Sequence, residues 1–330
     1  MLTDIHRHLD EMWYGRHPLV LALLPLSGPY QIVMRLRNWA YRAGLLPVHR
    51  FSAPLIVVGN ITVGGTGKTP LVIWLCNYLK GMGYIPGIVS RGYGGHAEHW
   101  PQQVRPDSDP RIVGDEAVLL ARRTGCPLAV GPDRVAAVEA LIDVAGCDII
   151  VSDDGLQHLR MGRDIEIAVL DSIRRFGNRH CLPAGPLREP CSRLASVDLL
   201  VSRGSAGRGE FAMQYTAAKL YRPGQSEFAL ELESLRDTSV HAVAGIGHPE
   251  QFFAMLKGKG LRVIPHVFPD HHEFVAGDLQ FNDRQPVLMT EKDAVKCERL
   301  NLPGDCYYVP IEAQLPDSFR HRLEKLIGKK

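Results

Sequence analysis

The stretch Leu55-Ile-Val-Val-Gly-Asn-Ile-Thr-Val-Gly-Gly-Thr-Gly-Lys-Thr-Pro70 decides the fold of this chain. Its apolar start suits a buried strand, its glycine-rich centre ends in Lys68 and Thr69, and Pro70 suits the first turn of a helix. This order is typical of a phosphate-binding loop, in which backbone N–H groups and a lysine contact phosphates and a hydroxyl ligates Mg²⁺. The residues predicted to bind nucleotide or metal here are Gly64, Gly65, Thr66, Gly67, Lys68 and Thr69.

The loop departs from the strict G-x-x-x-x-G-K-T pattern, because Thr62 stands where that pattern has its first glycine. Its Gly-Gly-Thr-Gly-Lys-Thr core is similar to the variant loop of nitrogenase-iron-protein-like ATPases and dethiobiotin synthetase. A glycine-rich turn without function is the alternative. The strand pattern before the loop and the helix pattern after it favour phosphate binding.

Short apolar runs alternate with helical patterns from residue 53 onward, which indicates βαβ units and a parallel sheet. We therefore predict an α/β fold in which a P-loop NTPase-like parallel sheet is flanked by helices. A second, smaller alternation follows after the linker-like stretch 204–209. The predicted units are an N-terminal helical segment (1–50), an ATP-binding catalytic domain (51–210) and a smaller α/β domain that contributes to the active-site cleft (211–330).

The elements behind this prediction come from apolar periodicity. The first alternation has predicted strands at 55–58, 85–89, 127–130, 149–151, 165–170 and 199–201, with helices near 70–81, 115–123 and 133–144. The second has predicted strands at 228–232, 240–244, 263–267, 287–289 and 307–309, with helices near 249–257 and 319–327.

Composition limits the classes of function. The formal charge of +2 over 330 residues gives no support for nucleic-acid binding, and no obligate protein partner is indicated. The 7 cysteines are scattered without a C-x-x-C pair, so neither a disulfide framework nor a zinc site is predicted. These features favour a reducing, cytosolic environment.

The N-terminal region is basic and apolar. No Asp or Glu occurs from residue 12 to residue 50, where Arg16, Arg35, Arg37, Arg42 and Arg50 all lie. The spacing over 31–43 predicts an amphipathic helix, whereas the apolar run 19–26 is broken by a proline and is shorter than the roughly 20 residues of a membrane span. The helix either packs on its own domain or lies at a membrane surface, and we favour the membrane surface.

Carboxylates follow two of the predicted parallel strands. Asp153 and Asp154 end the strand at 149–151, and Asp171 ends the next. The carboxyl ends of parallel strands face the ligand crevice, so one of the first pair would suit the acidic Mg²⁺ partner of the loop. Asp115 and Glu116 begin a helix, where acids also serve as caps, and Asp after a strand is also a turn residue.

Other candidate residues are a histidine and three arginines. His271 follows a strand of the second alternation beside Asp270, although a histidine next to an acid is more often structural than catalytic. Loop guanidiniums can clamp phosphates, although solvation at the surface is the default. The arginines concerned are Arg91, Arg134 and Arg188.

Taken in order, these motifs resemble the tetraacyldisaccharide 4′-kinase family over nearly the whole chain. The motifs are the phosphate loop 59–69, Ser90-Arg-Gly-Tyr93, Gly114-Asp-Glu-Ala117, Asp153-Asp-Gly-Leu-Gln-His158, Leu182-Pro-Ala-Gly-Pro-Leu-Arg-Glu-Pro190, Asp270-His271 and Thr290-Glu-Lys-Asp-Ala-Val295. The resemblance implies transfer of the γ-phosphate of MgATP to the 4′-hydroxyl of a tetraacylated glucosamine disaccharide 1-phosphate. The product would be lipid IVA, made in lipid A biosynthesis at the cytoplasmic face of the bacterial inner membrane.

The resemblance also implies roles for single residues. Asp115 would be the base for the sugar hydroxyl, with His271 as its dyad partner. Asp154, Arg134 and Arg188 would belong to the nucleotide end of the site, with His158 and Glu189 in support. The metal would be held by Thr69, Asp153 and Glu116.

Three other classes are compatible with parts of the pattern. A P-loop switch ATPase or GTPase of the metallochaperone type would need a Cys/His tract or a signalling lysine early in the loop, and Val63 stands before Gly64 instead. A soluble small-molecule kinase would leave the acid-free apolar N-terminus without a purpose. A purely structural protein of membrane surfaces would leave the phosphate loop unexplained.

Overall fold

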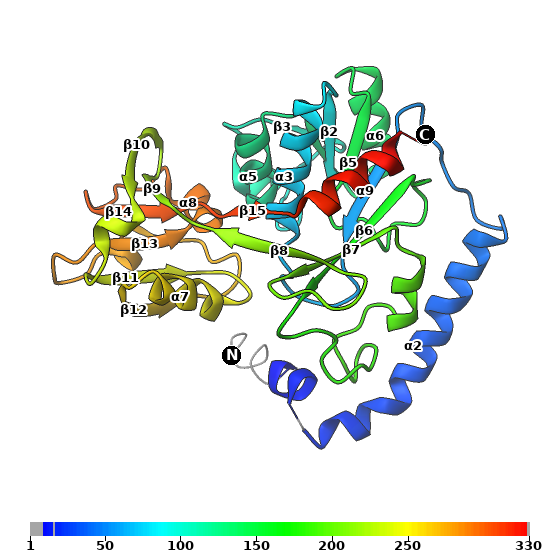
Figure 1. Ribbon diagram of the computed structural model, residues 1–330, viewed down its shortest axis with the longest axis horizontal. Helices are drawn as coiled ribbons and strands as arrows, with labels where there is room; N and C mark the ends of the chain where they lie inside the picture. The colour runs from blue at the N-terminus through cyan, green and yellow to red at the C-terminus, as the bar shows by residue number, and fades with distance from the viewer. Residues whose placement is uncertain (1–8, 16, 329–330) are drawn as a thin grey trace.

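The chain contains two sheets, which the computed structural model describes over residues 9–15 and 17–328 (Figure 1). The larger sheet has nine strands in the order β15-β8-β7-β6-β1-β5-β2-β4-β3. The smaller has six in the order β10-β9-β14-β13-β11-β12. The two sheets flanked by helices agree with the predicted α/β fold class.

The centre of the larger sheet is parallel and buried. Strand β1 (Leu55–Gly59) pairs in parallel with β5 (Ile149–Ser152) on one side and with β6 (Ile165–Asp171) on the other, and β2 (Pro86–Ser90) pairs with β5. All residues of these four strands are buried. Strands covered on both faces are read from sequence as continuous apolar runs, which is why their positions were predictable.

Helices cover both faces of this sheet. Helices α3 (Lys68–Gly81) and α5 (Asp115–Thr124) contribute to one apolar core, and α6 (Arg134–Asp143) contributes to the core on the opposite face. The remaining elements of this part of the chain are β3 (Gln102–Val104), α4 (Pro110–Val113), β4 (Leu128–Val130), η1 (Cys191–Ser196), β7 (Leu199–Arg203) and β8 (Phe211–Thr216).

The smaller sheet has a parallel part built from β11 (Ser239–Ala244), β12 (Arg262–Val267), β13 (Val287–Thr290) and β14 (Cys306–Val309). Antiparallel pairing adds β9 (Lys219–Arg222) and β10 (Gln225–Glu231) at one edge. Its other elements are η2 (Leu232–Leu235), α7 (Pro249–Gly258), η3 (Ala276–Leu279) and α8 (Glu291–Cys297).

The end of the chain returns to the larger sheet. Strand β15 (Glu312–Gln314) pairs with β8, and α9 (Asp317–Ile327) packs into the core beside α3 and α5 (Figure 1). Phe319 on α9 is fully buried and lies edge-on to Trp74 and Phe211. The helix predicted near 319–327 is therefore present but packs with the larger sheet. Residues 211–216 also lie in that sheet, and the division at 210/211 stays a prediction.

The N-terminal helix is longer than its periodicity predicted. Helix α2 (Leu19–Arg42) is continuous, with Pro25 and Pro29 inside it. Ser27 Oγ donates to the Cys181 carbonyl at 2.8 Å and Tyr30 Oη donates to the Arg188 carbonyl at 2.9 Å, and these contacts offset the helical hydrogen bonds that proline removes. The prediction that the helix begins at residue 31 was wrong, because tertiary contacts outweighed the proline signal.

Helix α2 is long enough and apolar enough to cross a membrane, by length and composition alone. Only 6% of its most apolar 18-residue stretch is buried. The apolar run 19–26 is by itself too short to cross a membrane, but the 24-residue helix is long enough. Figure 1 shows α2 running along one side of the larger unit, by which we mean the nine-stranded sheet with its helices. The smaller unit is the six-stranded sheet with its helices.

Candidate active site

The phosphate loop lies between β1 and α3, as its sequence predicted. Gly67 precedes α3 with a left-handed backbone, φ 89°, which favours glycine. A Cβ at this position would also lie 2.0 Å from the hydroxyl of Tyr215, which donates to the Gly67 carbonyl. Space and backbone conformation therefore both require glycine at the start of the helix.

Lys68 points from the loop to the carboxyl end of β5. Its Nζ lies 3.3 Å from Asp154 Oδ1, and Arg188 Nη1 lies 3.1 Å from Asp154 Oδ2. Burial by itself raises the pKa of Asp154, but the charges of Lys68 and Arg188 outweigh it and hold the pKa well below the ordinary range. The carboxylate thus stays ionised and fixes two cations beside the loop.

The pKa of the neighbouring Asp153 is shifted in the opposite direction. Burial, followed by repulsion from Glu116, raises its pKa to about 7. Its Oδ1 is buried without a hydrogen-bond partner among the described residues, as is Oγ1 of Thr66 in the loop. A carboxylate that is buried and incompletely paired beside a phosphate loop has the properties expected of a ligand for a cation.

Arg134 supports this region from beneath. Its side chain is buried, and Nη1 donates to the carbonyls of Asp153 at 3.0 Å and Asp154 at 2.9 Å. It therefore positions the backbone that carries both carboxylates. His158 lies near it, and burial together with the Arg134 charge lowers the pKa of His158 to about 4, so this imidazole is neutral.

Asp115 and His271 meet across the two sheets. Asp115 begins α5 of the larger unit and His271 follows β12 of the smaller one, and His271 Nδ1 lies 3.0 Å from Asp115 Oδ2. The hydrogen bond to Asp115 raises the pKa of His271. For Asp115, burial raises the pKa, but His271 and nearby lysines outweigh it, so the carboxylate is ionised. His272 turns away and contacts Asp278 at 3.0 Å.

A lysine beside this pair had no role assigned from the sequence. Lys292 Nζ on α8 lies 3.0 Å from Glu116 Oε1 and 3.3 Å from Asp270 Oδ1. Burial by itself lowers its pKa, but the surrounding carboxylates, Glu116 first, raise it, so Lys292 is charged. Lys292 lies in the Thr290-Glu-Lys-Asp motif, but the motif does not indicate which residues the lysine contacts.

His248 was also missed, because it lies in a short turn before α7 with no motif around it. A Cβ at Gly64 would lie 3.1 Å from its Nε2, so the smaller unit reaches the phosphate loop itself. Arg174 holds the ring, with Nη1 2.7 Å from His248 Nε2. Of the other predicted residues, Arg91 is exposed and Asp171 pairs with Arg203.

Helix α2 is joined to the site by polar side chains. Glu189 is buried and accepts from Gln157 Nε2 at 2.8 Å and from Asn38 Nδ2 at 3.3 Å. Gln157 Oε1 in turn accepts from Arg188, 3.4 Å away, which pairs with Asp154. A continuous row of polar contacts therefore runs from the phosphate loop to the exposed N-terminal helix.

Comparisons with known proteins agree over the whole chain. A family model described as Tetraacyldisaccharide-1-P 4'-kinase matches residues 19–328. Proteins named tetraacyldisaccharide 4'-kinase are similar to it: that of Nitrosococcus oceani is 56% identical over 99% of this chain and 96% of that protein, and that of Alkalilimnicola ehrlichii is 53% identical over 97% of both.

A solved structure is also similar. It is LpxK from Aquifex aeolicus in complex with ATP, with a TM-score of 0.78 and 27% identity, covering 94% of this chain and 99% of that chain.

The raised pKa of Asp153 predicts a pH-dependent effect on stability. Between its ordinary value of 3.8 and about 7, the folded protein keeps a proton that the unfolded chain releases, so the Asp153 contribution falls as pH rises. Without nucleotide and Mg²⁺, Asp153→Asn should raise the free energy of unfolding at pH 8 by on the order of 2 kcal/mol and much less at pH 5. Urea denaturation at both pH values measures this.

The exposed Asp107 provides the matched control, and Asp107→Asn should leave the free energy of unfolding nearly unchanged at both pH values. Equal destabilisation by Asp153→Asn at pH 5 and pH 8 would show that the carboxyl group is structural and carries no ionisation cost.

Proposed function

The chain belongs to the tetraacyldisaccharide 4′-kinase family, and on this premise we propose roles for the residues described above. The protein is an ATP-dependent lipid kinase that phosphorylates the 4′-hydroxyl of a tetraacylated glucosamine disaccharide 1-phosphate, giving lipid IVA in lipid A biosynthesis. The observation that carries the residue assignment is the contact of Asp115 with His271 beside a loop whose lysine pairs with Asp154.

The nucleotide phosphates would occupy the loop from Gly64 to Thr69. Its backbone N–H groups and Lys68 would contact them, with Lys68 exchanging part of its pairing with Asp154 for phosphate oxygens. Arg188 lies on the same carboxylate and would neutralise charge on the transferred group. Arg134 would act indirectly, because its guanidinium is engaged by backbone carbonyls.

Mg²⁺ fits the residues at this end of the site. A bound cation would contact the Asp153 Oδ1 that has no hydrogen-bond partner among the described residues and would lower the raised pKa of this carboxyl, and Thr69 and Glu116 would complete the protein ligands. The described residues contain no cluster of three His, Cys, Asp or Glu side chains able to hold a metal alone. This suits an ion bound largely through phosphates, which it neutralises when bound.

Asp115 would accept the proton of the sugar hydroxyl. Its carboxylate is ionised, it is buried, and it is oriented by the 3.0 Å contact with His271. In a loose phosphoryl-transfer transition state the proton leaves late, so a carboxylate of low pKa suffices if a partner shares the charge. Because the two residues come from different units, closure of the units would assemble the base.

Helix α2 would place this site at a membrane. Its exposed apolar residues Ile32, Val33, Leu36 and Trp39 recur at the spacing of one helix face and are each more than half exposed. An acyl-chain substrate leaves the bilayer only at a high cost, so an enzyme that acts on its headgroup gains by lying at the surface. We assign the protein to the cytoplasmic face of the bacterial inner membrane, where ATP is present.

Transfer of radiolabelled γ-phosphate from ATP to the detergent-solubilised tetraacyl disaccharide 1-phosphate tests the function directly. Wild type should label the lipid, and Lys68→Ala should lower the rate by about 100-fold or more, because charge neutralisation at the phosphates is lost. Lys80→Ala is the matched control on the same helix, since Lys80 Nζ donates to the Thr124 carbonyl at 2.8 Å near the opposite end of α3. Release of free phosphate without labelled lipid, from a folded wild type, would favour a switch ATPase.

The dyad predicts non-additive losses. Asp115→Ala and His271→Ala should each lower kcat by roughly 100-fold, and the double substitution should cost little more than either alone, because the residues act as one unit. His272→Ala controls for removal of an imidazole that contacts Asp278 instead. If the two losses multiply in the double variant, the dyad is wrong.

The membrane assignment predicts separation of binding from chemistry. Leu36→Asp with Trp39→Asp should lower co-sedimentation with phospholipid vesicles by about 10-fold or more, because two exposed apolar side chains no longer enter the interface. Turnover on detergent-solubilised substrate should persist. Val144→Asp changes an apolar residue that is 86% exposed on another surface, and should have no effect. Equal sedimentation of all three proteins would contradict the assignment.

A further inference from the structure

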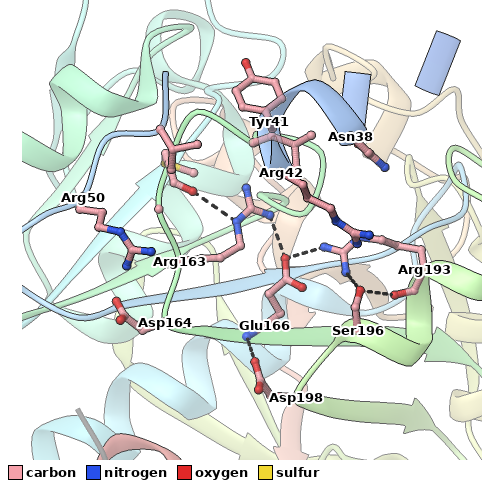
Figure 2. A pocket seen from close by; sticks show the side chains of 14 residues that line it. Asn38, Tyr41, Arg42, Arg50, Arg163, Asp164, Glu166, Arg193, Ser196 and Asp198 are labelled. Carbon is pink, nitrogen blue, oxygen red and sulfur yellow. Dashed lines mark hydrogen bonds and ion pairs between the residues drawn. The ribbon is translucent and has the colours of Figure 1, made fainter. Parts of the chain in front are cut away.

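A cavity lies beside the C-terminal end of α2, away from the phosphate loop and from the Asp115–His271 pair. It has a volume of about 380 Å³ and is lined from three directions: by the end of α2 and the segment after it, by residues 159–166, and by η1 and Asp198, which precedes β7 (Figure 2). Its lining includes four arginines, Arg42, Arg50, Arg163 and Arg193, and three acids, Asp164, Glu166 and Asp198.

The floor of the cavity is a fixed network of charges. Glu166 accepts from Arg163 at 2.9 Å and from Arg193 at 2.5 Å, and Arg193 also lies 3.4 Å from Glu189. For Glu166, burial raises the pKa, but the two guanidiniums outweigh it, so the carboxylate is ionised. Two guanidinium groups therefore share the single negative charge of the Glu166 carboxylate.

The two aspartates are held by backbone groups. Asp164 Oδ2 accepts from the N–H of Leu55 at 2.9 Å, and Asp198 Oδ2 accepts from the N–H of Glu166 at 2.8 Å. They therefore brace the ends of strands β1 and β6 beneath the cavity. Side chains from the end of α2 and the segment after it form the rim of the cavity.

The rim carries two further arginines. Figure 2 shows Arg50 on one side of the cluster, beside Asp164, and Arg42 on the other, above the guanidinium of Arg193. Both are exposed at the residue level. Glu166 already accepts from two arginines of the cluster, and Asp164 accepts from the Leu55 N–H. The rim guanidiniums therefore provide planar donors of the kind that bind phosphate oxygens.

An apolar surface adjoins the same rim. Val48 lines the cavity and is 42% exposed, and Leu45 and Leu46 beside it are 65% and 38% exposed. These exposed apolar residues follow the C-terminal end of α2 in the chain. A ligand with a phosphate in the cavity and acyl chains beside it would contact charge and apolar surface together.

We propose that this cavity binds the phosphate group of a lipid whose acyl chains lie in the same membrane leaflet as α2. The proposal rests on the membrane placement of α2 given above. Two lipids carry the required chemistry: a bulk anionic phospholipid, and the substrate itself through its 1-phosphate, which lies at the opposite end of the disaccharide from the reacting 4′-hydroxyl. Arg42 and Arg50 would contact the phosphate, and Val48 the start of the chains.

Single substitutions at the rim test the proposal against a matched control. Arg35 is an exposed arginine on α2 that does not line the cavity, so Arg35→Ala removes equal charge from the same helix. In the first arm, each full-length protein is partitioned onto phosphatidylcholine vesicles with and without phosphatidylglycerol. In the second, KM is measured in neutral detergent for the tetraacyl disaccharide with and without its 1-phosphate.

Occupation by phospholipid predicts that Arg42→Ala and Arg50→Ala each lower partitioning onto phosphatidylglycerol vesicles by about 5-fold, with Arg35→Ala clearly less affected. Occupation by the substrate predicts that Arg42→Ala and Arg50→Ala each raise KM about 5-fold for the 1-phosphorylated substrate, at unchanged kcat. KM for the substrate without the 1-phosphate should stay the same. If Arg42→Ala and Arg50→Ala match Arg35→Ala in both arms, the proposal is overturned. Failure of wild type to label lipid would instead count against the proposed function.

Discussion

The buried charges at the carboxyl end of β5 are the constraint on which the site depends. Asp154 is paired with Lys68 and Arg188, whereas its neighbour Asp153 is buried without a full set of partners. Two adjacent carboxylates in one low-dielectric region cannot both be ionised cheaply, and the protein resolves this by assigning the cations to one of them. The other carboxylate keeps one oxygen without a hydrogen-bond partner among the described residues, which is why we propose it as a ligand of Mg²⁺.

The two sheets meet at the site through polar side chains. His271, Lys292 and His248 all come from the smaller unit and reach Asp115, Glu116 and the phosphate loop of the larger one. The return of β15 and α9 to the larger core connects the units at a second point.

Helix α2 lies at the other end of a chain of polar contacts that begins at Asp154. Arg188, Gln157 and Glu189 connect that carboxylate to Asn38 on the helix, and the basic cavity at the end of α2 shares Glu189 through Arg193. A lipid held against this helix would thus present its headgroup along a row of polar side chains that leads to the phosphate loop.

The sequence alone determined the phosphate loop, the central parallel strands and the ordered motifs that indicate the family, because each rests on local periodicity or on residues close in the chain. It did not determine which of His271 and His272 turns toward Asp115, that Lys292 joins Glu116 to Asp270, or that α2 runs through Pro25 and Pro29. It also left the charge states of Asp153 and Asp154 undistinguished. These features depend on contacts between residues far apart in the chain, and only folding brings those residues together.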